Sequence, residues 1–147
     1  MKKFLAVLFV MLLMCGPAFA ARTSVSTLIA STDLDAAPTS VTGTAKVGSA
    51  DKIAFFVTYD EAETGGGLSV AVTLTVSPDN STFLAASFYD YAGGSTLQTS
   101  EVLSADSNYV FWVNPDLAMP YVKVTLTATG SDVDDIATVS TKIITQE

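Results

Sequence analysis

The fold class is decided by one stretch of sequence, Leu68-Ser69-Val70-Ala71-Val72-Thr73-Leu74-Thr75-Val76-Ser77. Large aliphatic residues occupy every second position of this stretch, and Ser, Thr or Ala fills the positions between them. Because successive side chains of a β-strand point to opposite faces, the stretch has one apolar face and one small, hydroxylated face. On a helix, the same residues would spread around the whole circumference. The pattern therefore predicts a β-strand with one buried side.

A cluster of turn-forming residues follows this strand, Ser77-Pro78-Asp79-Asn80-Ser81. Pro fixes its own φ angle, and Asp and Asn bond to nearby backbone, so this composition is typical of a tight turn. Apolar sequence resumes at Phe83, which predicts a return strand over Phe83–Tyr89. We therefore expect a β-hairpin at the centre of the chain.

Further strands are expected on both sides of this hairpin, as runs rich in β-branched and aromatic residues that Gly, Pro, Asp or Asn interrupt. Gly43 predicts a bulge or an edge position for its strand. Two runs, 52–59 and 109–113, are apolar on both faces, which predicts central positions and burial of Trp112 in the core. The expected strands cover residues 22–30, 41–47, 52–59, 97–103, 109–113, 121–129 and 137–145, with a loop over residues 31–40.

Eight or nine such strands, with turn signals every 8–14 residues and no convincing helical pattern, predict an all-β fold. The spacing is typical of an antiparallel two-sheet β-sandwich, either jelly-roll or immunoglobulin-like. In such a sandwich, the apolar faces of the two sheets pack against each other. A closed barrel is the alternative architecture for the same pattern.

The first 20 residues have the composition of an export signal. Lys2 and Lys3 precede an apolar run over residues 4–14, and Ala18-Phe19-Ala20 supplies the small residues of a cleavage site. The apolar run is shorter than the roughly 20 residues that a membrane-spanning helix needs. We therefore expect residues 1–20 to be a signal peptide that is cleaved off and takes no part in the fold. The protein would then be secreted, extracellular or periplasmic, in a bacterium.

Cleavage after Ala20 leaves residues 21–147, enough for a single β-sandwich domain. The chain has 7 basic and 15 acidic residues, and because Lys2 and Lys3 belong to the leader, the mature chain is acidic, with a net charge of −10. Such a surface repels nucleic-acid phosphates and anionic lipids. We therefore expect no nucleic-acid partner and no membrane insertion after cleavage.

The chain has no histidine, and its one cysteine, Cys15, lies in the leader. Lipidation of Cys15 is the alternative to simple cleavage, although Met14 is larger than the residue that usually precedes a lipidated cysteine. The mature chain lacks the residues for a disulfide, an imidazole or thiolate metal site, or a nucleophile relay through histidine. Paired carboxylates alone hydrolyse glycosides in some enzymes, but no acidic pair here has a recognisable catalytic setting. We expect no enzyme activity and no required cofactor.

Two groups of residues are candidate ligand sites. Asp132, Asp134 and Asp135 place three carboxylates within four residues. Ca²⁺ prefers such oxygen ligands, so one interpretation is a calcium site and the other is a solvated turn. Tyr89 and Tyr91 flank a Gly-Gly loop and are candidates for stacking on sugar rings.

Four segments also share a pattern, Val76-Ser77-Pro78-Asp79-Asn80-Ser81-Thr82-Phe83, Phe88-Tyr89-Asp90, Tyr109-Val110-Phe111-Trp112 and Pro120-Tyr121-Val122-Lys123-Val124. Together they resemble small β-sandwich proteins and domains of phage virions and prophage regions, in which a strand ends in Ser-Pro-Asp-Gly before an aromatic residue. Asn80 stands where Gly is usual, and Asn tolerates the left-handed backbone of this turn. The resemblance implies a β-sandwich with a structural or adhesive role, and it carries no catalytic residues.

The favoured hypothesis is a secreted, non-enzymatic structural or adhesive β-sandwich that acts through protein–protein contacts or self-association. Its setting would be the cell surface, in an extracellular or virion-like assembly. Edge strands support this, because their unpaired backbone groups invite another chain, and the strand over residues 22–30 could pair in its own domain or in a neighbour's. The alternative is a carbohydrate-binding module, with or without calcium.

Overall fold

β-Strands form the regular secondary structure of the computed structural model, which describes residues 22–35, 39–48, 50–61, 67–91, 96–113, 119–130 and 135–147. Among these residues, no helix is long and apolar enough to cross a membrane. The strands are β1 (Thr23–Asp35), β2 (Ser40–Lys46), β3 (Lys52–Glu61), β4 (Ser69–Ser77), β5 (Leu84–Ala86), β6 (Phe88–Asp90), β7 (Leu97–Gln98), β8 (Ser100–Leu103), β9 (Ser107–Val113), β10 (Tyr121–Thr129) and β11 (Ile136–Gln146).

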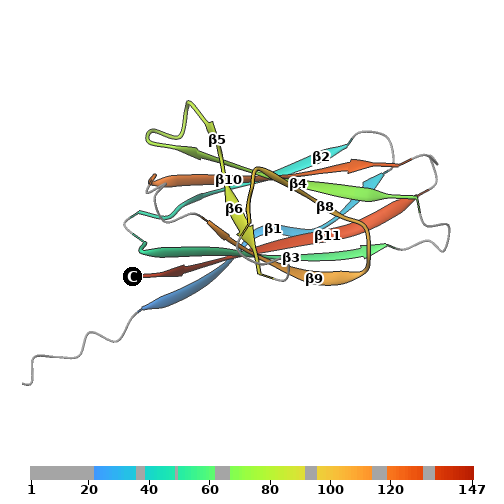
Figure 1. Ribbon diagram of the computed structural model, residues 1–147, viewed down its shortest axis with the longest axis horizontal. Coiled ribbons are helices and arrows are strands. Elements are labelled where there is room, and N and C mark those ends of the chain that lie inside the picture. Colours follow the sequence, from blue (N-terminus) through green and yellow to red (C-terminus); the bar gives the residue numbers. More distant parts are fainter. Residues whose placement is uncertain are drawn as a thin grey trace, which may run out of the picture.

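The strands form two antiparallel sheets, one above the other in Figure 1. The six-stranded sheet has the order β1-β11-β3-β9-β6-β7. The five-stranded sheet has the order β2-β10-β4-β5, and β8 also pairs with β4. The predicted antiparallel two-sheet sandwich is thus confirmed, and so are the central positions of β3 and β9 and the edge position of β2.

The described residues form 11 strands rather than the predicted eight or nine, because two of the predicted strands pass from one sheet to the other. The return strand of the hairpin begins as β5, which pairs with β4, and continues after Ser87 as β6, which pairs with β9. Likewise, β7 pairs with β6 in the six-stranded sheet, and after Thr99 the chain continues as β8, which pairs with β4. Each crossing divides one predicted strand into two short strands.

The core lies between the inward faces of the two sheets. All five aliphatic residues of the opening stretch are buried, as the alternation predicts, and so are the inward residues of β10, which pairs with β4. Opposite them, the six-stranded sheet supplies its own buried residues, among them Phe55, Val57, Tyr59, Phe111 and Val139. Burial of these apolar faces is the main stabilising contribution to this fold.

The first strand differs from its prediction. Residues 31–35, predicted as loop, continue β1, whose pairing with β11 has register shifts between Thr27 and Ile29 and between Ile29 and Thr32. These irregularities break the alternation that sequence reasoning relies on. Since β1 pairs with β11 of its own chain, the structure has the in-domain arrangement for this strand.

Candidate functional site

A row of apolar side chains crosses the outer face of the six-stranded sheet. Its members come one from each strand and are joined by the pairing register, in the order Val25, Ile144, Ala54, Trp112, Tyr89 and Leu97. Paired residues of neighbouring strands point to the same face of a sheet, so these side chains are lateral neighbours. We refer to this set as the apolar row.

Much of the apolar row is open to solvent. Val25 is 60% exposed, Leu97 44% and Trp112 39%, whereas Ala54 is buried beneath its neighbours and Ile144 and Tyr89 are half-buried. Single exposed apolar residues are common on proteins, but several gathered on one face of a sheet make that face a candidate contact surface.

The predicted burial of Trp112 in the core is wrong. β9 is apolar on both faces, and Phe111 and Val113 take the inward positions, with 1% and 6% of their surfaces exposed. The pattern of a strand that is apolar on both sides does not say which side faces the core. Trp112 therefore falls on the outer face, opposite Ala54 of β3 and Tyr89 of β6.

The two tyrosines proposed for sugar stacking both lie at this face. Tyr89 belongs to the apolar row, directly beside Trp112. Tyr91 is 74% exposed, and its backbone N–H donates a 2.9 Å hydrogen bond to the carbonyl of Val110, one row away. Sequence reasoning found these two residues but missed the four aliphatic members and Trp112, because the row exists only through pairing between strands distant in sequence.

The outer face of the five-stranded sheet has a different chemistry. There the pairing register aligns a row of hydroxyl side chains, Thr42, Thr125, Thr73 and Ser100. Next to it, the ammonium of Lys123 lies 4.0 Å from the ring centroid of Phe83. One outer face thus carries a row of hydroxyl side chains and the other a row of apolar side chains.

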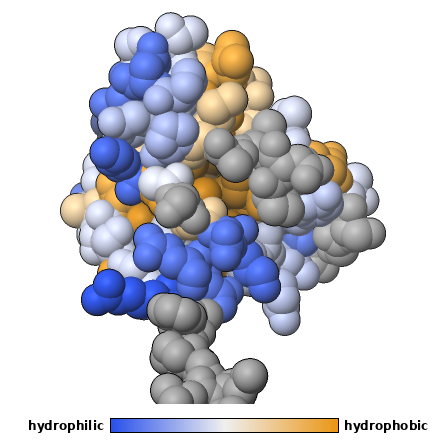
Figure 2. All heavy atoms as spheres, turned by 90° about the vertical axis from the view of Figure 1, so that its left-hand side faces the viewer, coloured by the Kyte–Doolittle hydropathy of each residue, from blue (hydrophilic) through white to orange (hydrophobic). Residues whose placement is uncertain are grey.

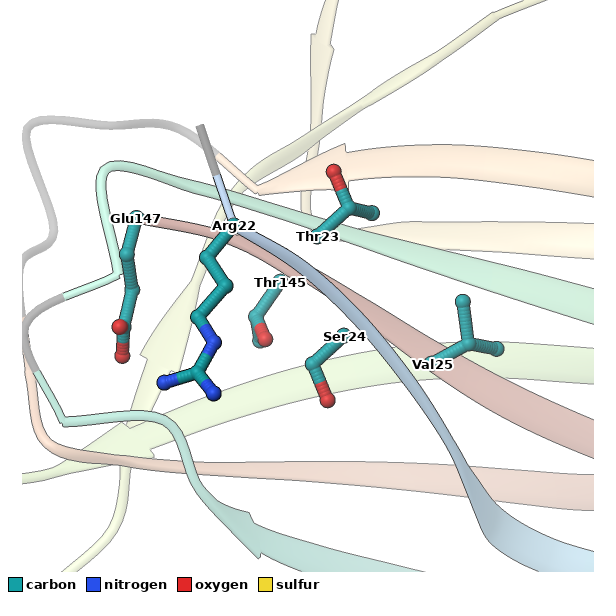
Figure 3. Close-up of a pocket in the computed structure, with 6 residues that line it drawn as sticks. All are labelled: Arg22, Thr23, Ser24, Val25, Thr145 and Glu147. Atoms are coloured by element: carbon teal, nitrogen blue, oxygen red, sulfur yellow. The ribbon is translucent and has the colours of Figure 1, made fainter. Parts of the chain in front are cut away.

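A hollow of about 520 Å³ lies where the two ends of the described chain meet. The backbone N–H of Arg22 donates a 3.1 Å hydrogen bond to the carbonyl of Glu147, and the N–H of Glu147 donates a 3.0 Å hydrogen bond to the carbonyl of Arg22. Figure 3 shows the side chains of Arg22, Ser24, Thr145 and Glu147 on one side of the β1–β11 ladder and those of Thr23 and Val25 on the other. Among the described residues that line the hollow, Glu147 supplies the one carboxylate side chain.

Figure 2 views the end of the sandwich at which the C-terminus lies. Hydrophilic atoms gather in its lower part, and apolar atoms reach the surface above them. The hollow is lined by Arg22, Ser24, Thr145 and Glu147 among others, so its walls are mainly polar. Its hydroxyls and charges suit hydrogen bonding to solvent or to a small polar group.

The predicted calcium site falls mostly outside the described residues. Asp132 and Asp134 are not among them, whereas Asp135 is, and it is 6% exposed just before β11. Within the described residues, no three His, Cys, Asp or Glu side chains form a group that could hold a metal ion. The calcium site stays a prediction.

Other acidic residues have structural roles. The carboxylate of Asp79 accepts hydrogen bonds from the hydroxyls of Ser77 and Ser81 and from the backbone N–H groups of Ser81 and Thr82. These hydrogen bonds hold the pKa of the Asp79 carboxyl well below its usual range, and the bond from the Ser81 hydroxyl has the largest effect. The residue thus fixes the turn between β4 and β5.

No protein-family model matches the sequence, and no curated protein matches it. Among solved structures, the chain is similar to the SPBc2 prophage-derived protein YomS, with a TM-score of 0.59 and 15% identity over 90% of this chain and 99% of that one. It is also similar to the infectious bursal disease virus VP2 subviral particle, with a TM-score of 0.54 and 10% identity over 90% of this chain and 34% of that one. At these identities the likeness shows the fold alone. The resemblance to prophage and virus β folds is confirmed at that level.

Proposed function

We propose that this chain is an exported, non-enzymatic structural or adhesive subunit, which acts through protein–protein contacts in an extracellular or virion-like assembly. The observation that carries the proposal is the exposed apolar row, since a contiguous apolar surface on a folded domain is typical of an interaction site. The fold it shares with a prophage-derived protein and a subviral particle gives additional support.

The first strand supports the same proposal. Residues 23–27 of β1 are exposed, and β1 stands at the end of the six-stranded sheet with β11 as its ladder partner. Their side chains therefore add little to the core, and among the described residues the edge of Thr23–Thr27 away from β11 has no ladder partner, which leaves it available for pairing. An edge of this kind suits a subunit that meets other chains.

Electron microscopy of the exported protein tests the proposal. We expect rings, filaments or other particles of defined size in the purified protein, or ordered decoration of the cells that export it. Isolated single domains, both in solution and at the cell surface, would contradict an assembly role.

A specific observation also favours a second candidate function, carbohydrate binding. Tyr89 and Trp112 lie side by side on an exposed face, and aromatic rings in that position stack on sugars. Co-sedimentation with an insoluble polysaccharide tests it: Trp112→Ala should abolish binding, and Val102→Ala, at an exposed residue of the other sheet, should not.

A further inference from the structure

We propose that the apolar row is the docking surface for a second copy of this chain, packed face to face with the order of the strands reversed. The inference rests on the proposed function and specifies the partner in the assembly contact as a second copy of the chain. In this arrangement a two-fold axis runs parallel to the strands, between β3 and β9. It places β1 opposite β7, β11 opposite β6 and β3 opposite β9 of the second copy.

The apolar row is complementary to itself in size under this reversal. Val25 faces Leu97 of the second copy, and Ile144 faces Tyr89. At the axis, Ala54 faces Trp112, so the smallest member of the row meets the largest, twice. Ala54 has the shortest side chain of the row and is 1% exposed, covered by its bulkier neighbours, so the indole ring of the other copy packs over the lowest point of the row. Such close packing is typical of symmetric interfaces.

The charges near the row also fit the reversal. The row contains no charged residue, so two acidic chains meet there without burying like charges. Lys142 lies on β11, one row away, between Thr27 and Phe56. Reversal brings its ammonium to the β6 side of the second copy, where the exposed ring of Tyr91 is a cation–π partner. The lysine therefore does not meet its own counterpart.

The size of the face is adequate for a dimer. The six strands of this sheet contain 46 residues, and each covers about 16 Å², from a rise of about 3.3 Å and a strand spacing of about 4.8 Å, so the face measures roughly 700 Å². The resulting face is close to the roughly 800 Å² per partner of a standard interface. Two sheets that pack face to face keep their strand directions within about 30°, as an axis parallel to the strands requires.

A second copy fits this surface better than a sugar chain does. Sugar rings stack on aromatic side chains, but four of the six row members are aliphatic, and they lie on both sides of the aromatic pair. Aliphatic side chains gain from contact with another apolar surface, which the same row of a second copy supplies.

The test uses two exposed valines of similar exposure on opposite faces of the sandwich. Val25 is 60% exposed in the apolar row, and Val102 is 56% exposed on β8 of the other sheet. The dimer dissociation constant of the exported protein is measured by sedimentation equilibrium, with circular dichroism melting to confirm that each variant is folded. We expect Val25→Lys and Trp112→Ala each to raise the constant by at least about tenfold, and Val102→Lys to leave it unchanged within about twofold.

A size exchange tests the contact at the axis. Ala54→Trp combined with Trp112→Ala moves the large residue to the neighbouring strand and keeps the volume of the row. The double variant should recover most of the association lost in Trp112→Ala, because Trp at position 54 then faces Ala at position 112 of the second copy. If the double variant folds but does not recover this association, the reversed arrangement is wrong.

The remaining outcomes distinguish a wrong docking surface from a wrong partner and from a wrong proposed function. If particles persist unchanged in Val25→Lys and Trp112→Ala, the docking surface is wrong and the proposed function stands on another surface. If the wild type stays monomeric at about 1 mM, where even a weak pair associates, the second copy is wrong. A monomer that binds a polysaccharide through Trp112 would assign the row to a glycan and overturn the proposed function as well.

Discussion

Asn80 has a φ of 64°, in the left-handed region, within the turn that joins β4 to β5. Asn tolerates this conformation better than most residues, and its backbone N–H donates a 3.0 Å bond to the Ser77 hydroxyl. The turn anticipated from Ser77-Pro78-Asp79-Asn80 therefore forms with Asn in the position that Gly takes elsewhere.

This geometry gives a prediction for two substitutions at one position. Asn80→Gly should change the free energy of unfolding by less than about 0.5 kcal/mol, since Gly reaches positive φ without strain. Asn80→Val should lower it by about 1–2 kcal/mol, the cost of left-handed backbone for a residue with a Cβ branch. Urea unfolding measures both. Equal stabilities of the two variants would mean that the turn does not constrain this residue.

Tyr59 ties the two sheets together. It lies on β3, is 1% exposed, and its hydroxyl donates a 2.9 Å hydrogen bond to the carbonyl of Leu68, just before β4. Burial, and then the negative charge of Glu61, raises the pKa of Tyr59 to about 12. The neutral phenol, which is the donor, is therefore the form that the folded state favours.

The shift predicts how stability depends on pH. The pKa of Tyr59 is higher in the folded state than the value of 10.0 expected when unfolded, so its contribution is complete below pH 10 and is lost between pH 10 and about 12. Tyr59→Phe should cost about 1–3 kcal/mol at neutral pH, because the Leu68 carbonyl loses its donor, and the gap to wild type should narrow above pH 10. Chemical unfolding of both proteins from pH 7 to 11 measures this. A difference in unfolding free energy between wild type and Tyr59→Phe that stays constant with pH would contradict the raised pKa of Tyr59.

Among the elements, the inward faces of β4 and β10 could be predicted, but not the burial of Ser77 at the end of β4, and β9 could be predicted only in part. In β4 and β10 one face is apolar and the other carries Ser, Thr or Lys, so the alternation alone identifies the buried face. In β9 both faces are apolar, and which face points to the core depends on how β9 pairs with β3 and β6. The sequence contains that information only through long-range register, and Trp112 was misplaced for this reason.

The pairing of β1 also depends on contacts that are not local. Gly43 of β2 lies against the irregular part of β1: a Cβ at Gly43 would be 2.6 Å from the Leu28 carbonyl oxygen and 2.8 Å from Cγ1 of Ile29. The glycine anticipated as a mark of an edge strand therefore has a second role, which is to let two backbones approach closely.

We predict that Gly43→Ala lowers the free energy of unfolding by about 1–3 kcal/mol, because the added methyl group overlaps backbone that cannot move aside without disturbing β1. Thr44→Ala, at the exposed neighbouring position, is the control and should stay within about 0.5 kcal/mol of wild type. Thermal melting compares the two. A Gly43→Ala variant as stable as its control would show that β1 and β2 are not held in close contact.

At the scale of the whole molecule, the two outer faces of the sandwich account for the proposed function. The alternation of single strands predicted the fold and the inward faces, but the apolar row is assembled from five separate pairings between strands. Tyr89 was found from its place beside a loop, whereas Val25, Ala54 and Leu97 have no local signal. A surface formed by register is visible only once the sheet order is known.

Cross-linking of single-cysteine variants tests the docking surface most directly, since the mature chain is expected to contain no other cysteine. Val25 and Leu97 lie on opposite edge strands of one sheet, but the reversed dimer places each opposite the other. Packed sheets lie about 10 Å apart, too far for a disulfide, so a short bismaleimide is the reagent. A mixture of Val25→Cys and Leu97→Cys proteins should give the mixed cross-linked dimer in large excess over either self-linked dimer. Self-linked dimers in equal or greater yield, or no dimer at all, would contradict the face-to-face contact.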